Sequence, residues 1–182
     1  MYEQSRISVL AAVASPITAV AFGLIAWRWP HLPDLLLLSI FASTAVQLIE
    51  MDFVERRLAR VLIWPTATAI LGVLFMSVTV HATEVSSLIQ AIAGGALLSG
   101  AYLVAALVTS GGVGAGDVRL AAPVGLILGW HGWTMLITGT VLGLVGTCVV
   151  AGVARRATRV NFRGAIPHGP GMLAGAFAAI SI

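Results

Sequence analysis

The sequence contains no lysine, a single cysteine and few charged residues, which make up 9% of its 182 positions. Soluble domains carry about 25% charged residues. This low charge, together with 59% hydrophobic residues, therefore indicates an integral membrane protein. One cysteine, Cys148, excludes a disulfide framework and a cysteine-built zinc site. The four histidines are scattered and form no HExxH pattern, so we expect neither a metal nor any other cofactor.

Arginine supplies all ten basic side chains, and the formal net charge is +3. Most of these arginines lie in short segments between apolar runs, so we do not expect nucleic-acid binding. The first apolar run lacks a convincing cleavage site and is followed by further runs, unlike a signal peptide. No polar stretch is long enough to form a second domain. We therefore expect one membrane-embedded domain over residues 1–182.

Seven apolar segments follow one another along the chain. Their approximate limits are 7–27, 35–51, 61–80, 86–109, 118–130, 133–153 and 166–182. Most of them reach the roughly 17–25 residues that a membrane-spanning helix needs. The fifth has about a dozen residues, which is consistent with a tilted or partly re-entrant helix. The expected fold class is all-α, a polytopic membrane helix bundle of six to seven transmembrane helices.

Paired glycines four residues apart occur in the last three segments. They are Gly125 and Gly129, Gly139 and Gly143, and Gly171 and Gly175. Such pairs let helix backbones approach closely in lipid, where van der Waals packing drives association. A membrane protein that is simply rich in glycine would also contain such pairs, so both interpretations stay open here.

The arginines also indicate the topology. If the N-terminus is cytoplasmic and the spans alternate, every arginine except Arg28 falls on the cytoplasmic side. The positive-inside rule favours this orientation over its opposite. Asp52 and Asp117 then lie at the cytoplasmic ends of their helices and share one membrane face. We therefore expect a protein of the cytoplasmic (inner) membrane whose site faces the cytoplasm.

The stretch Gly114-Ala115-Gly116-Asp117-Val118-Arg119-Leu120 places an acid and an arginine in an apolar background. Carboxylates at membrane depth are costly, and those that occur there usually serve chemistry or ion movement. An aspartyl protease needs two carboxylates that share one proton, one to activate water and one to polarise the scissile carbonyl. Asp52 and Asp117 come from different helices and are expected at one depth. Gly114 and Gly116 would allow a substrate backbone to approach.

Asp117 and Asp52 also admit structural roles in place of catalysis. For Asp117 we favour a functional role over a structural ion pair with Arg119, because burying a charge is costly. For Asp52 alone, the functional and the structural interpretation are equally open, because acids are common at helix ends. Glu50 and Glu55 flank Asp52 and are interpreted as solvated interfacial acids.

The remaining acids are weaker candidates than these. Glu3 falls in the N-terminal tail, and Asp34 and Glu84 are assigned to the outer loops between apolar segments.

The pattern resembles the type IV prepilin peptidases, a branch of the GxGD aspartyl proteases. Residues 114–120 match the family signature GxGD(V/L)(K/R)L, and Asp52, followed by Leu58, matches the first family aspartate. Ile166-Pro167-His168-Gly169-Pro170 is similar to the IPFGP element before the last helix. The resemblance covers about residues 35–182. It implies that Asp52 and Asp117 are the catalytic pair, with Gly114, Gly116 and Arg119 as supporting motif residues.

The chain also departs from the family pattern. Ala59 and Arg60 stand where the family usually has Pro and Asn or Asp, and His168 replaces a phenylalanine. For His168 we favour an interfacial histidine over a role near the site. Large bacterial members carry paired CxxC motifs and a methyltransferase activity. This chain contains one cysteine, so it resembles the short form, and we expect no N-methylation.

The function implied by the resemblance is removal of the basic leader from a type IV prepilin or pseudopilin precursor at the cytoplasmic membrane boundary. The expected partners are that precursor and the lipid bilayer, and the sequence does not indicate an oligomeric state. The alternatives are a small proton-coupled transporter and an inactive membrane assembly factor. A transporter also uses buried carboxylates. It would more often show internal repeats and polar residues in mid-span, and neither is evident here.

Overall fold

The structure is a computed structural model that describes residues 23, 27, 31–54, 59–80, 84–109, 113–158 and 168–181. The described part of the chain is entirely helical. Its helices are α2 (Leu32–Val54), α3 (Ala59–Thr79), α4 (Val85–Val108), α5 (Ala115–Trp130), α6 (Trp133–Thr158) and α7 (Gly169–Ser181). The prediction of an all-α fold is therefore confirmed.

Six of the seven predicted segments correspond to these helices, and the segment 7–27 lies almost wholly outside the described residues. The predicted limits differ mainly at two helix ends. α5 begins at Ala115, three residues before the predicted start, and α6 continues to Thr158. Because alanine and glycine are small and weakly apolar, the first turn of α5 reads as part of the preceding loop. α5 is nevertheless short, with 16 residues, as expected.

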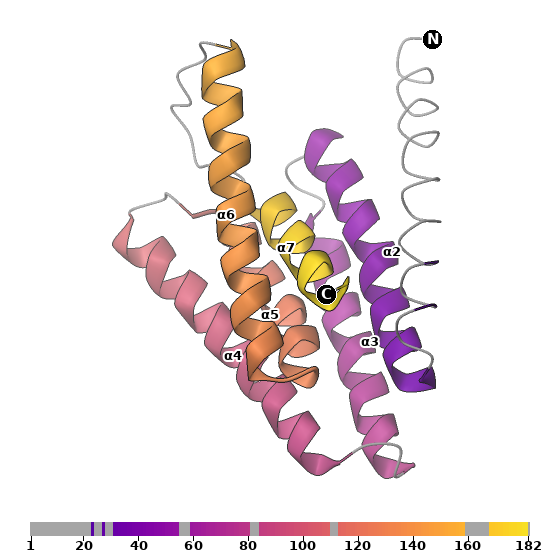
Figure 1. The fold of residues 1–182 in the computed structure, drawn as a ribbon. Coiled ribbons are helices and arrows are strands. Elements are labelled where there is room, and N and C mark those ends of the chain that lie inside the picture. The colour runs from indigo at the N-terminus through magenta and orange to yellow at the C-terminus, as the bar shows by residue number, and fades with distance from the viewer. Residues whose placement is uncertain are drawn as a thin grey trace.

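Successive helices run in opposite directions, so the bundle has two distinct ends (Figure 1). At the upper end in Figure 1, α2, α4 and α6 finish, while α5 and α7 begin. This end is called the Asp117 end below. At the opposite end, α2 begins and α5 finishes at Trp130, and it is called the Trp130 end.

Helix α5 is the centre of the bundle and contacts all the other described helices. Its residues from Leu120 onward are almost all buried, among them Ala121, Val124, Ile127 and Leu128. A helix that is apolar and covered on every side belongs in the interior of a larger helical assembly. The neighbours of α5 therefore determine where its first residues lie.

Glycines allow the two closest helix contacts. A β-carbon on Gly94 of α4 would lie 2.6 Å from the backbone oxygen of Gly125 in α5. A β-carbon on Gly175 of α7 would lie 2.6 Å from the backbone oxygen of Gly139 in α6. Only glycine permits such approach of one backbone to another. The packing interpretation of the glycine pairs is therefore confirmed for both contacts.

The outer faces of α4 and α6 remain apolar although they are exposed. On α4, the exposed side chains include Ile89 at 62%, Leu103 at 50% and Leu107 at 72%. Among the described residues, α4 is the helix that is long and apolar enough to cross a membrane. Shorter apolar stretches of 10–17 residues occur in α2, α3, α6 and α7. Exposed apolar surface on this scale is unusual for a soluble monomer.

Candidate active site

Asp117 lies in the first turn of α5, as its third residue. Gly114 precedes the helix in an extended conformation with φ −70° and ψ 145°. The backbone oxygen of Gly114 accepts the N–H groups of Asp117 at 3.0 Å and Val118 at 3.3 Å, which starts the helix. The first turn of a helix exposes unpaired N–H groups and favours a negative charge. The sequence GAGD thus forms a helix start that suits a carboxylate.

The same carboxylate also lies against the start of α7. The backbone N–H of His168 donates to Oδ2 of Asp117 at 3.4 Å. His168 directly precedes α7, and its backbone oxygen accepts the N–H of Met172 at 2.9 Å. A β-carbon on the next residue, Gly169, would lie 3.4 Å from Oδ1 of Asp117 and 3.5 Å from Leu120. Asp117 is therefore held between the starts of two helices, α5 and α7.

His168 was predicted to be an interfacial histidine without a role near the site. The structure contradicts this, because the backbone of His168 contacts the Asp117 carboxylate directly. Its imidazole ring lies edge-on to the ring of Tyr102 from α4, with centroids 6.4 Å apart and planes at 81°. The contact to Asp117 uses the peptide N–H, which every residue except proline has. The type of side chain at position 168 therefore could not predict this contact.

Tyr102 is a site residue that the sequence reasoning missed. It is half-buried on α4, and its ring contacts the ring of His168, whose backbone N–H binds Asp117. The chain has two tyrosines, and Tyr102 stands inside a long apolar run. A phenol within a spanning segment is a polar group in apolar surroundings, and this was the signal available for it.

Asp52 is the third residue from the end of α2, so its backbone lies at the Asp117 end of the bundle (Figure 1). Its side chain is outside the described part of the structure, as are those of Glu50 and Glu55. Helices α2 and α5 contact one another directly. The helices that carry Asp52 and Asp117 are thus neighbours, and their pairing stays a prediction.

The supporting motif residues surround Asp117 in different ways. A β-carbon on Gly114 would lie 3.3 Å from Oδ2 of Asp117, whereas one on Gly116 would have no atom of the described residues within 4 Å. Within the described part of the chain, nothing therefore covers Gly116 beside the carboxylate. Arg119 is half-exposed, and no ion pair joins it to Asp117, although the structure describes both side chains. This absence argues against a purely structural Asp117–Arg119 pair.

A narrow space lies one turn farther along α5, among α2, α3, α5 and α7. It is too narrow to hold a water molecule. The Thr66 hydroxyl donates to the Thr44 hydroxyl across it at 3.2 Å. Its lining residues are Phe41, Thr44, Ile63, Thr66, Leu120, Pro123 and Leu173. The region beneath Asp117 is therefore almost entirely apolar, with one buried polar contact between α2 and α3.

One acid does not lie where the sequence placed it. Asp34 was assigned to an outer loop, but it is in the first turn of α2 and accepts a hydrogen bond from Trp130 of α5. Pro33 precedes it within the first turn of α2, a place where proline is well tolerated. Glu84 precedes α4 and is exposed, as expected. In the described ranges, His, Cys, Asp and Glu form no group of three able to hold a metal ion.

Comparison with known proteins identifies one family. A family model described as the type IV leader peptidase family matches residues 35–154. This range includes α2 to α5, with Asp52 and Asp117, and most of α6. No curated protein and no solved structure matches the chain.

Proposed function

The chain belongs to the type IV leader peptidase family, and from this premise we propose that it is an aspartyl endopeptidase of the cytoplasmic membrane. Its proposed reaction is removal of the leader from type IV pilin-like precursors. The observation that supports this most is the position of Asp117. Its backbone N–H is bound by the Gly114 carbonyl at the start of α5, and its carboxylate accepts the N–H of His168 at the start of α7. A catalytic group needs such fixed surroundings.

The proposed mechanism uses Asp52 and Asp117 as a pair that shares one proton. The ionised carboxylate takes a proton from water while the water oxygen attacks the scissile carbonyl carbon. The protonated carboxyl donates its proton to the carbonyl oxygen. The tetrahedral intermediate then collapses, the C–N bond breaks, and a proton passes to the leaving nitrogen. No covalent enzyme intermediate, metal or cofactor takes part.

The surface and the charge pattern together support the proposed membrane placement. We propose a single polytopic domain of six to seven spans over residues 1–182, with lipid covering the apolar outer faces of α4 and α6. The arginine distribution favours a cytoplasmic position for the Asp117 end. Cleavage at that boundary suits a substrate whose basic leader is cytoplasmic and whose helix remains in the bilayer.

The substrate is proposed to approach Asp117 along the side of Gly116. That position is exposed, and no atom of the described residues lies within 4 Å of where a β-carbon would be, so a substrate backbone can come close. The resemblance to prepilin peptidases implies a glycine before the scissile bond. With one cysteine in the chain, we propose cleavage without N-methylation of the product.

The test is cleavage of a defined precursor in lipid vesicles. The precursor carries a basic leader, a glycine and an apolar helix, and mass spectrometry identifies the bond that is cut. The wild type is expected to cut after the glycine, and Asp117→Asn, which keeps size and polarity but cannot ionise, is expected to be inactive. Glu84→Gln, which removes an exposed acid at the opposite end, serves as the matched control.

Two outcomes would contradict the proposal. The first is a wild type that inserts correctly and cuts nothing. The second is an Asp117→Asn variant that cuts as fast as the wild type, which would favour the transporter or assembly-factor interpretation.

A further inference from the structure

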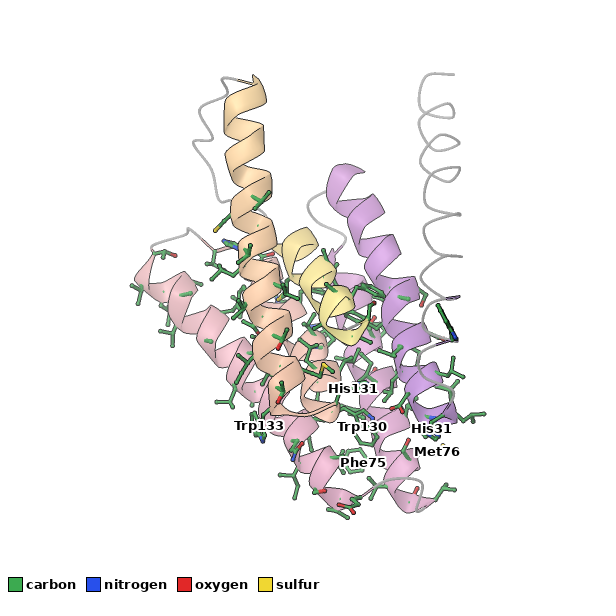
Figure 2. The ribbon with its side chains drawn as sticks, viewed as in Figure 1. His31, Phe75, Met76, Trp130, His131 and Trp133 are labelled. Carbon is green, nitrogen blue, oxygen red and sulfur yellow. The ribbon has the colours of Figure 1, made fainter. Side chains whose placement is uncertain are left out.

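Three polar side chains meet at the Trp130 end of the bundle, far from Asp117. Asp34 lies in the first turn of α2, Trp130 is the last residue of α5, and His131 follows it. The indole N–H of Trp130 donates to Oδ1 of Asp34 at 3.0 Å, across 96 residues of sequence. Figure 2 shows Trp130 and His131 side by side at this end of the bundle. This hydrogen bond is called the Asp34–Trp130 tie below.

The tie is well shielded from water. Trp130 is 6% exposed, and the side chains of His131 and Asp34 are 3% and 17% exposed. Burying a polar group costs free energy unless it is hydrogen-bonded, so a buried indole N–H and carboxylate stabilise the fold only while they stay together. Separation of α2 from α5 at this point would leave both groups without that contact.

His131 lies beside the tie on the α5 side. Its Nδ1 lies 2.9 Å from the backbone oxygen of Ile127, and because a carbonyl only accepts, Nδ1 carries the proton. The other ring nitrogen, Nε2, lies 3.8 Å from Oδ1 of Asp34. His131 thus closes the last turn of α5 while it faces the same carboxylate that Trp130 binds. The end of α5 is anchored to the start of α2 through one aspartate.

The two helices joined here are the ones that carry the proposed catalytic pair. At 1.5 Å per residue, Asp34 is about 27 Å along α2 from Asp52, and Trp130 is about 20 Å along α5 from Asp117. The main neighbour of α2 is α3, and that of α5 is α4, whereas the direct α2–α5 contact is small. A hydrogen bond at that small contact therefore limits sliding of one helix along the other.

We propose that Asp34 and Trp130 are positioning residues that set the position of Asp52 along the bundle axis relative to Asp117. The inference rests on the proposed function, because it assumes that these two aspartates act as a pair. Two carboxylates that share a proton must keep their geometry within about 0.5 Å. A displacement of about 1 Å, transmitted along a stiff helix, is enough to cost up to about 100-fold in rate.

The first test compares three variants in the vesicle assay. Trp130→Phe removes the donor and keeps an aromatic ring, and it is expected to lower kcat by about tenfold with KM within about twofold. Asp34→Asn keeps an oxygen acceptor for the indole and is expected to stay within about threefold of the wild type. Glu84→Gln removes the exposed acid at the same end, which hydrogen-bonds only within its own turn, and is expected to match the wild type.

Two kinetic results would overturn the inference. One is an unchanged kcat in Trp130→Phe, even if that variant unfolds at a lower temperature, because the tie would then be structural only. The other is a fall in Asp34→Asn as large as that in Trp130→Phe, because the hydrogen bond would then not be what sets the geometry.

The second test measures the geometry without any activity. In a Cys148→Ser background, Asp52→Cys and Asp117→Cys are joined by a short thiol cross-linker in membranes. Adding Trp130→Phe is expected to lower the cross-linking yield at least about twofold, and adding Glu84→Gln is expected to leave it unchanged. Equal cross-linking yields with and without Trp130→Phe would overturn the positioning role of the Asp34–Trp130 tie and leave the pairing of the two aspartates standing. No cross-link in the reference protein overturns the pairing of the two aspartates, and the proposed function and the tie fail with it.

Discussion

Replacing Gly175 by alanine tests whether the contact between α6 and α7 sets the position of the Asp117 carboxylate. A β-carbon at position 175 would meet the backbone nitrogen and Cα of Gly143 and would lie 2.6 Å from the backbone oxygen of Gly139. Real β-carbon contacts are rarely shorter than 3.4 Å. Since all three atoms belong to the backbone of α6, α7 has to move away by roughly 1 Å.

The magnitude follows from two effects of that displacement. Overpacking a close contact costs about 1–3 kcal/mol, so the variant is expected to unfold at a lower temperature. The start of α7 carries the N–H of His168, which donates to Asp117. A shift of about 1 Å in a group that orients a catalytic side chain costs up to about 100-fold in rate, so we expect kcat to fall by about 10- to 100-fold.

The matched control is Gly146→Ala, on the same helix α6. A β-carbon at position 146 would have no atom within 4 Å, so this change tests only the replacement of glycine by alanine in a helix. Precursor cleavage and the temperature of heat-induced aggregation are measured for both variants. A Gly175→Ala variant with the kcat and heat stability of the wild type would refute the reasoning, as would an equal loss in Gly146→Ala.

Three further predictions concern the rest of the bundle and the site. Gly94→Ala is expected to lower the aggregation temperature, because its β-carbon would lie 2.6 Å from the backbone oxygen of Gly125, whereas Gly100→Ala, with no atom within 4 Å, is expected to leave it unchanged. His168→Phe is expected to keep cleavage within about fivefold, because the donor to Asp117 is a peptide N–H; a loss above about 100-fold would instead make the imidazole essential. Incubation with a metal chelator is expected to leave cleavage unchanged, and a loss that added metal restores would contradict the two-carboxylate mechanism.

The helices themselves could be predicted from the sequence, because each is a long apolar run with clear breaks. The start of α5 was placed three residues too late. Gly114, Ala115 and Gly116 contribute little to an apolar pattern, yet the backbone of Gly114 starts the helix and the two following residues form its first turn. Backbone hydrogen bonds determine this helix boundary, and a pattern of hydrophobic side chains therefore does not predict it.

The glycine pairs show what the spacing of residues along one helix can predict and what it cannot. Close packing was one of the two interpretations of Gly125 and Gly129, but their partners Gly94 and Gly95 on α4 were not singled out. Spacing along one helix identifies a face that can pack closely. It does not identify the helix that packs there, because that choice depends on the whole arrangement of the bundle.

The sequence predicted only part of the candidate site. Asp117 was identified because a carboxylate in an apolar run is costly. The N–H of His168 and the position of Tyr102 were missed, because both depend on α4, α5 and α7 meeting at one end of the bundle. Asp34 was assigned to a loop, and its contact with Trp130 was missed because the two residues are 96 positions apart in the sequence.

The pairing of Asp52 with Asp117 is the central claim, and cleavage by Asp52→Asn tests it most directly. The variant is assayed on the same precursor beside Asp117→Asn, with Glu50→Gln and Glu55→Gln as neighbours that each lose one negative charge. We predict that Asp52→Asn is as inactive as Asp117→Asn, while both glutamine variants cleave at close to the wild-type rate. An Asp52→Asn variant that cleaves at the wild-type rate would contradict the account, and inactivity of Glu50→Gln or Glu55→Gln in its place would assign the second carboxylate to that residue.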